Sequence, residues 1–203
     1  MKYLQKLGKA IMLPVAVLPV AAIMMGIGYA MCPATMQGGD VTGIVQIIGF
    51  ALVKIGSAVI DKLPMLFAVG VAIGLSKDQH GAAGLAGLVA FLTVTTVLNS
   101  GVVATMMGAE EAPLAFTKID NAFIGIISGI TASVCYNKFS SAQLPTALAF
   151  FSGKRCVPIV TSFVMVAESA ILYFVWPMLF NALVWVGEQI MGLGPVGAGL
   201  YAF

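Results

Sequence analysis

Two long apolar stretches of this chain are joined by the segment Leu144-Pro-Thr-Ala-Leu-Ala-Phe-Phe-Ser-Gly-Lys-Arg-Cys-Val-Pro-Ile-Val160. Two adjacent aromatics, a turn and two adjacent cations mark this segment; they are Phe150, Phe151, Gly153, Lys154 and Arg155. Aromatic rings and Lys or Arg side chains are typical of the boundary between a membrane and water. We therefore predict an amphipathic loop at a membrane surface, with a membrane helix on each side.

The composition of the chain favours a membrane protein. Of its 203 residues, 60% are hydrophobic and only 9% are charged, whereas a soluble domain carries about 25% charged residues. So few charges cannot cover a surface that faces water, so lipid must surround much of the chain. The net charge of +2 is too small to indicate a nucleic-acid partner, and no basic helix supports one.

Five apolar stretches are candidates for membrane crossings, because a spanning helix needs about 20 mainly apolar residues. The second stretch is longer than one straight crossing needs and contains Pro64, so we expect a break there. Its first part is then tilted or interfacial. The expected crossings are Ala10–Ala30, Ile44–Ile60 continued by Leu63–Leu75, Gly81–Leu98, Ala122–Tyr136 and Val157–Trp176.

The remaining segments complete the expected fold. Asn99–Asn121 is a mixed loop that is partly re-entrant. Pro177 ends or kinks the fifth crossing, and Met178–Ile190 either continues it or lies flat on the membrane. The predicted fold class is therefore all-α: a polytopic membrane protein with about five transmembrane helices plus interfacial or re-entrant segments.

The cations predict the orientation of these helices. With the N-terminus inside, seven cations face the cytoplasm: Lys2, Lys6, Lys9, Lys77, Lys138, Lys154 and Arg155. Only Lys118 then lies outside, together with the carboxylates of Asp40, Glu110, Glu111, Asp120 and Glu188. Cytoplasmic loops carry an excess of Lys and Arg. We therefore expect a multi-pass protein of the cytoplasmic membrane with a cytoplasmic N-terminus.

Small residues on the crossings predict close helix packing. They are Gly81, Gly84 and Gly87 in the third crossing, and Gly125 and Gly129 in the fourth. Glycine lets two membrane helices approach closely, although a GxxxG pair alone is a weak signal. We expect these faces to take part in self-association.

Four charged residues lie within apolar stretches: Lys54, Asp61, Lys62 and Glu168. Lys62 is expected to reach a lipid headgroup. Charges inside a membrane are costly and are often functional. Lys54 and Asp61 share a helical face, where they can pair, and structural or interfacial roles are favoured over contact with a substrate. A neutral Glu168 that bonds to a neighbouring helix is favoured over a proton relay.

The sequence contains no recognisable motif of catalytic residues. No nucleotide-binding loop, hydrolase motif or metal-binding motif occurs, so we expect no catalytic residues, no metal and no cofactor. His80 is expected to be a solvated loop residue. For Lys154 and Arg155 two roles stay open: anchoring lipid phosphates, or a functional movement of their loop.

The 144–160 segment closely resembles the cytoplasmic loop of the sugar-translocating IIC subunit in the glucose family of the bacterial phosphotransferase system. The matching residues are Leu144, Pro145, Phe150, Phe151, Gly153, Lys154, Arg155, Val157, Pro158 and Ile159, and the chain departs at Cys156, where an aromatic is usual. Further similar stretches are Leu7–Ala21, Asp61–Ala72, Ser76–Asp78, Gly81–Ala83, Phe123–Gly129 and Tyr136–Phe139. The turn at Ser76–Asp78 and the stretch Lys118–Asn121 look most like the N-acetylglucosamine branch.

The resemblance implies a function and partners. It implies that residues 1–203 are the N-terminal scaffold and dimerisation half of a IIC domain, working as a homodimer in membrane lipid. The sugar-binding half, and the IIB and IIA domains, are expected beyond Phe203, so no substrate-binding residue is assigned here. The complete system is a sugar phosphotransferase that imports N-acetylglucosamine or glucose and receives its phosphoryl group from a phosphorylated IIB domain. The alternative is a truncated, non-transporting membrane protein that dimerises with full-length permeases.

Overall fold

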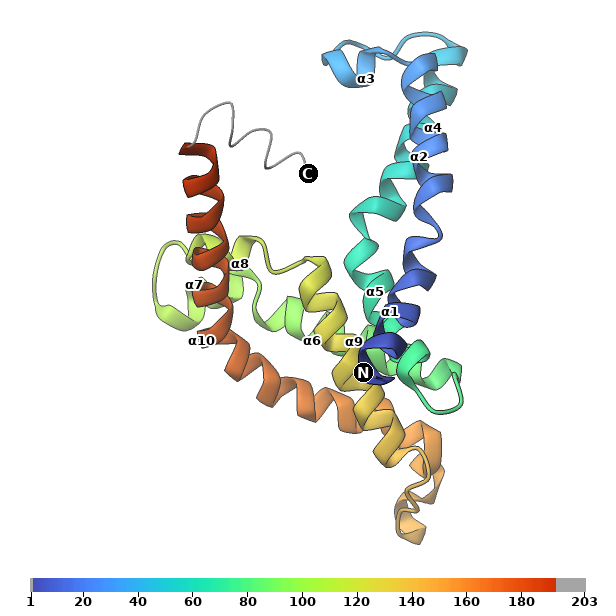
Figure 1. The fold of residues 1–203 in the computed structure, drawn as a ribbon, viewed down its shortest axis with the longest axis vertical. Helices are drawn as coiled ribbons and strands as arrows, with labels where there is room; N and C mark the ends of the chain where they lie inside the picture. Colours follow the sequence, from blue (N-terminus) through green and yellow to red (C-terminus); the bar gives the residue numbers. More distant parts are fainter. Residues whose placement is uncertain (1, 193–203) are drawn as a thin grey trace. The chain divides into compact units, whose positions relative to one another are not determined.

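The computed structural model describes residues 2–192, which are helical and contain no β-strand. Figure 1 shows the helices in chain order. Their bounds are α1 Lys2–Val15, α2 Leu18–Met31, α3 Ala34–Gln37, α4 Ile44–Asp61, α5 Leu63–Leu75, α6 Gly81–Val97, α7 Ser100–Met107, α8 Leu114–Thr117, α9 Ala122–Phe139 and α10 Cys156–Gly192. Two short 3₁₀ helices, η1 Thr146–Phe151 and η2 Gly153–Arg155, lie between α9 and α10.

The predicted all-α membrane fold is confirmed. Four helical spans in the described residues are long and apolar enough to cross a membrane: Tyr3–Met31, Ile44–Asp61, Ala122–Phe139 and Gly153–Gly192. A fifth arises if α6 and α7, which are bent by 48° at their junction, form one broken span.

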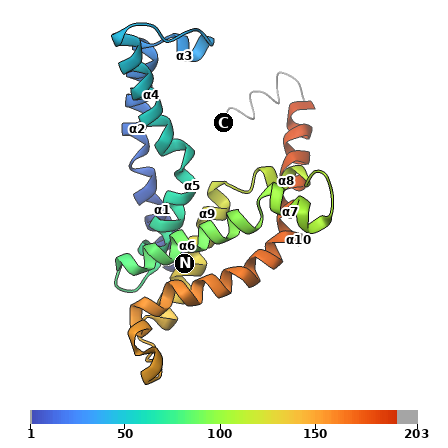
Figure 2. The ribbon, with the colours of Figure 1, turned by 180° about the vertical axis from the view of Figure 1, so that it is seen from behind.

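The chain divides into two compact units, and each is described by itself. Unit 1 comprises 1–91 and 121–162, and unit 2 comprises 92–120 and 163–203. In unit 1, α2 packs along α4, with α3 at the far end of the pair, as both Figure 1 and Figure 2 show. In the same unit α5 packs between α1 and α9.

Prolines set several helix boundaries. Pro14 lies near the end of α1 and Pro19 in the first turn of α2, so the first span is interrupted between the two helices. The expected break near Pro64 is also present, since α4 ends at Asp61 and α5 starts at Leu63 with Pro64 in its first turn. A proline fits a first turn because its missing N–H has no helical partner there. Pro177, in contrast, does not end α10, which continues to Gly192.

Polar caps start two further helices. The side chain of Asn99 accepts a hydrogen bond from the Gly101 N–H at the start of α7. Asn121 does the same for the Ile124 N–H at the start of α9. The expected mixed loop 99–121 therefore contains two short helices, α7 and α8.

Unit 2 is held together by aromatic side chains. The rings of Phe116 and Tyr173 stack with centroids 5.6 Å apart. The Trp176 indole is buried, and its Nε1–H donates to the Ala115 carbonyl at 2.7 Å. These contacts join α8 to the second part of α10.

Candidate functional site

The candidate site lies in unit 1, where the turn after α5 meets the loop between α9 and α10. The turn begins at Ser76, whose hydroxyl donates to the Ile73 carbonyl at 2.7 Å and ends α5. Gln79 follows with a positive φ of 50°, a conformation that few side chains adopt. His80 then starts α6, because its Nδ1 accepts the Ala82 N–H at 3.1 Å.

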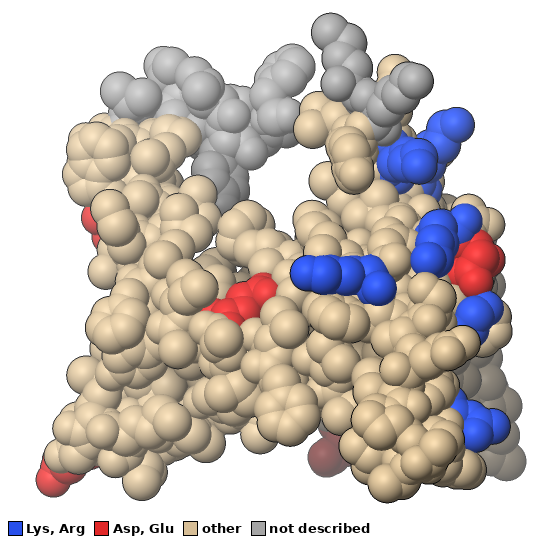
Figure 3. Space-filling model, turned by 90° about the horizontal axis from the view of Figure 1, so that it is seen from below, with Lys and Arg blue, Asp and Glu red and all other residues tan. Residues whose placement is uncertain are grey.

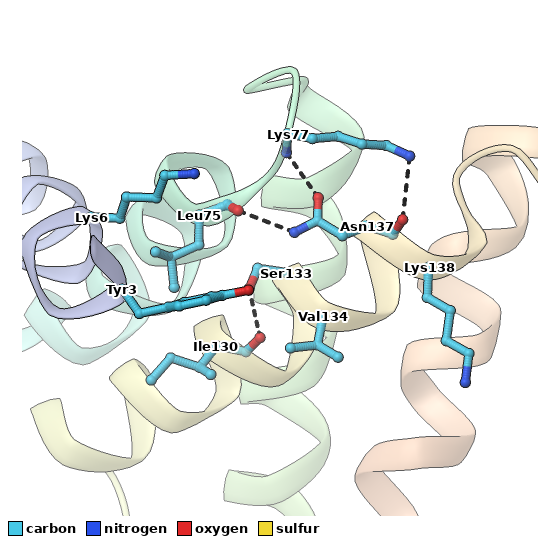
Figure 4. Close-up of a pocket in the computed structure, with 9 residues that line it drawn as sticks. All are labelled: Tyr3, Lys6, Leu75, Lys77, Ile130, Ser133, Val134, Asn137 and Lys138. Carbon is cyan, nitrogen blue, oxygen red and sulfur yellow. Dashed lines mark hydrogen bonds between the residues drawn. The ribbon is translucent and has the colours of Figure 1, made fainter. Parts of the chain in front are cut away.

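Asn137 ties this turn to α9. Its amide oxygen accepts the Lys77 N–H at 2.8 Å, and its amide nitrogen donates to the Leu75 carbonyl at 3.1 Å. The Lys77 ammonium also donates to the Asn137 carbonyl at 3.2 Å. Figure 4 shows these three bonds side by side. The Asn137 side chain thus provides hydrogen-bond partners for the Lys77 N–H and the Leu75 carbonyl, which have no helical partner at the end of α5.

Asp78 receives two further donors. The Lys154 Nζ lies 2.7 Å from its Oδ2, and the Tyr136 hydroxyl donates to the same oxygen at 3.0 Å. The hydrogen bond from Lys154, with that from Tyr136, lowers the pKa of the Asp78 carboxyl to about 2. The carboxylate in turn raises the pKa of Lys154. The pair is about 40% exposed on each side, so its main effect is to position the loop rather than to add stability.

The loop has a defined shape of its own. The Gly153 N–H donates to the Ala142 carbonyl at 2.8 Å, and the Ser152 hydroxyl accepts the Leu144 N–H at 3.0 Å. Gly153 has φ +70°, which favours glycine because a side chain there is strained. These bonds bring the two ends of the loop together and place Lys154 over the turn.

The cations and aromatics of the loop meet each other. The Arg155 guanidinium donates to the Phe150 carbonyl at 3.2 Å, and its Cζ lies 4.8 Å from the centre of the Phe150 ring. Phe151 packs edge-on against Phe150 at 5.3 Å. An exposed cation over an aromatic ring contributes about 0.5–1 kcal/mol, so Arg155 and Phe150 order each other.

A hollow of about 560 Å³ lies beside these residues. Its wall is almost entirely apolar and includes Phe150, Phe151 and Ile159, while His80, Lys154 and Arg155 border it. Several Lys and Arg side chains are visible on the face that Figure 3 shows, and most of them lie toward one side of it. Cations beside exposed aromatics fit an anionic partner.

All five loop residues singled out in the sequence therefore lie in one cluster. The sequence interpretation missed the residues that position them, namely Asp78, Tyr136, Asn137 and Lys77. His80, expected to be a solvated loop residue, is exposed but also starts α6. One signal in the sequence could have found Asp78. Its carboxylate lies in a short turn that the predicted topology places on the same side of the membrane as Lys154.

The predicted intramembrane charges do not join this cluster. Lys54 is exposed on α4, and its Nζ lies 5.4 Å from the centre of the Phe50 ring. Asp61 is exposed at the end of α4, and these two described residues form no ion pair with each other. Glu168 is half-buried on α10 in unit 2.

The predicted packing glycines lie against α5 of the same chain. A side chain at Gly125 would collide with the Pro64 carbonyl, and one at Gly129 would come within 2.8 Å of the Ala68 carbonyl. Gly84 and Gly87 likewise face Ile73 and Ala68. Gly81, in contrast, has nothing within 4 Å of its position for a side chain.

Comparison with known proteins gives one matching family and two similar curated proteins. The family described as "Phosphotransferase system, EIIC" matches residues 8–203. The N-acetylglucosamine-specific EIICB component of Bacillus subtilis (strain 168) is 38% identical over 201 residues, which cover 99% of this chain and 38% of that protein. The N-acetylglucosamine-specific EIICBA component of Escherichia coli (strain K12) is 36% identical over 208 residues, covering 99% of this chain and 27% of that protein. The chain thus spans well under half the length of these curated relatives.

Proposed function

Because this chain belongs to the phosphotransferase system EIIC family, we propose that it forms the N-terminal scaffold part of a sugar permease. The complete permease imports N-acetylglucosamine or glucose and couples import to phosphorylation. N-acetylglucosamine is favoured, because two relatives are named as specific for it. The observation that carries this function is the family match over residues 8–203, on helices long enough to span a membrane.

Within this permease, residues 1–203 position the helices and leave sugar contact to other segments. A sugar site needs several converging polar groups in a shielded cleft. A hollow of about 510 Å³ in unit 2 has only Ser169 and Tyr173 as polar side chains on an otherwise apolar wall. Calorimetry with N-acetylglucosamine and glucose, on the chain in lipid nanodiscs, should detect no binding tighter than about 1 mM. Saturable tighter binding would place a sugar site inside this part.

Import is tested with a chimera. The first part of the Bacillus subtilis EIICB relative is replaced by residues 1–203, which align with it over 201 residues. Cells that lack their own permease should then take up radiolabelled N-acetylglucosamine and release it inside as the phosphate. A chimera that reaches the membrane in normal amounts, yet imports no N-acetylglucosamine, would overturn the proposed function.

The loop cluster is proposed to lie in the cytoplasm and to contact the phosphorylated IIB domain. Support comes from its charge, since Lys154 and Arg155 border the hollow with the Phe150 ring. Lys6 and Lys77, from α1 and the turn after α5, share a second hollow, so the predicted cytoplasmic cations of unit 1 gather at one end. In the chimera, Arg155→Gln should slow phosphorylation by the IIB domain more at low salt than at high salt, because salt screens the charge that the variant removes.

A homodimer belongs to the same proposal, as the family resemblance implies. Its interface is expected away from the α5–α9 contact, because Gly84, Gly87, Gly125 and Gly129 already face α5. Cross-linking in membranes and light scattering in mild detergent should both give a dimer. The alternative of a non-transporting interaction protein is not favoured, because the matched relatives are permease components.

A further inference from the structure

A second hollow, of about 440 Å³, opens between α1, α9 and the end of α5 in unit 1. Its residues are of two kinds. Lys6, Lys77 and Asn137 provide polar groups, and Leu75, Ile130 and Val134 provide an apolar wall. An adjoining hollow of about 520 Å³ shares Lys6, Leu75 and Lys77, and adds Lys9. Together they form a cation-rimmed pocket that descends along an apolar helix face.

The side chains in Figure 4 show how this pocket is arranged. Lys6 extends from α1 toward Leu75, and the Tyr3 ring lies along the pocket toward Ser133. Lys77 is held on the other side by its bonds to Asn137. Lys138 points away, and its Nζ lies 5.6 Å from the centre of the Phe139 ring. Three cations line the pocket, Lys6, Lys77 and Lys138, and the Lys77 ammonium is fixed at its rim by the Asn137 carbonyl.

These cations have no carboxylate available to neutralise them. Among the described residues that line either hollow, Asp78 is the only acidic one. Its carboxylate already binds Lys154 and the Tyr136 hydroxyl. Lys6 and Lys9 are exposed, so the pocket attracts an anion from outside.

We propose that this pocket binds an anionic phospholipid, with its phosphate between Lys6 and Lys77 and its acyl chains along Ile130 and Val134. Basic pockets between membrane helices bind anionic headgroups. Val134 is 58% exposed and lies on α9, which is long and apolar enough to cross a membrane. A soluble phosphate would use the lysines but gain nothing from this apolar wall, so the lipid is the better match. Tyr3 suits the membrane–water interface, where amphipathic rings gather.

The test is lipid binding to the full purified chain in neutral detergent, measured by native mass spectrometry. Phosphatidylglycerol is compared with phosphatidylcholine of the same acyl chains, and with 10 mM inorganic phosphate or glycerol 3-phosphate as competitors. The variant Lys6→Gln with Lys77→Gln should weaken phosphatidylglycerol binding by about five-fold for each lysine removed. The matched control, Lys54→Gln with Lys62→Gln, removes the same charge from exposed positions outside the pocket and should change binding less than two-fold.

Each outcome of this test either supports or overturns the proposed lipid site. Preference for phosphatidylglycerol that is lost only in the pocket variant supports the lipid site. Equal binding of both lipids, or equal loss in both variants, overturns it. Full competition by the soluble phosphates would assign the pocket to a soluble anion and overturn the lipid. If the double variant loses helical circular dichroism, Lys6→Glu decides instead, since an acidic side chain near the start of α1 suits the helix. Sugar import plays no part in this test, so its result is separate from that of the permease function.

Discussion

The ammonium of Lys154 lies 2.7 Å from the carboxylate of Asp78, across 76 residues of sequence. The contact joins the turn after α5 to the loop before α10, and the Tyr136 hydroxyl completes it from α9. Three separate segments of unit 1 therefore meet at one carboxylate oxygen. This meeting point determines where Arg155 and Phe150 are presented.

Removal of the Asp78 charge should loosen the loop without unfolding unit 1. In Asp78→Asn, the Gly153 amide should exchange its hydrogen about two- to five-fold faster, because an exposed ion pair contributes little free energy. Hydrogen exchange with mass spectrometry measures this. Asp40→Asn, which neutralises an exposed carboxylate elsewhere, is the matched control. Equal changes in the two variants would contradict the positioning role of Asp78.

The loop should also open at acid pH, in a defined window. The pKa of the Asp78 carboxyl falls from its usual 3.8 to about 2 in the folded chain, so the ionised form is the one that folding favours. Its stabilising contribution is complete above pH of about 4 and is lost as the pH falls toward about 2. An environment-sensitive dye on Ser141→Cys reports the transition. The native cysteines are buried, and Asp78→Asn should show no transition in this window.

A methyl group at Gly125 should destabilise the packing of α5 on α9. The added atom of Gly125→Ala would collide with the Pro64 carbonyl, and overpacking of this kind costs about 1–3 kcal/mol. The thermal midpoint in detergent should fall. Gly81→Ala has open space around it and should leave the midpoint unchanged or higher. A lower midpoint for Gly81→Ala alone would argue against the packing described here.

The indole of Trp176 should contribute to the stability of unit 2. Trp176→Phe removes the hydrogen bond to the buried Ala115 carbonyl, and an unsatisfied buried acceptor costs about 1–3 kcal/mol. Denaturant unfolding followed by circular dichroism checks this. Trp185→Phe is the control, because Trp185 is 60% exposed. Similar losses of unfolding free energy in both variants would show that the indole ring, and not its hydrogen bond to Ala115, stabilises unit 2.

The proposed orientation predicts which loops an impermeant thiol reagent reaches in intact cells. With the native cysteines replaced, Gly39→Cys should be labelled from outside. Ser141→Cys should be labelled only after the membrane is opened. Both positions are exposed in the structure, so burial cannot account for a difference. Labelling of Ser141→Cys in intact cells would reverse the topology.

Local sequence determined the helices of this protein. Whether an apolar stretch can span a membrane depends on its length and composition, and a helix boundary depends on prolines and caps a few residues away. For that reason the fold class, the break near Pro64 and the exposed loop with Phe150 and Arg155 could be predicted. The same local rules left the effect of Pro177 open, and only the structure placed it inside a continuous α10.

The tertiary structure alone decided which of these local features meet. The Asp78–Lys154 pair and the Lys6–Lys77 pocket each join segments that are far apart in the chain. Their distances depend on how α1, α5 and α9 pack, which no short-range pattern encodes. Glycine spacing predicted that another helix approaches closely, but it did not identify that helix. In the structure α5 packs against Gly125 and Gly129. A small residue permits close contact with any helix of complementary shape, so its presence alone does not select one.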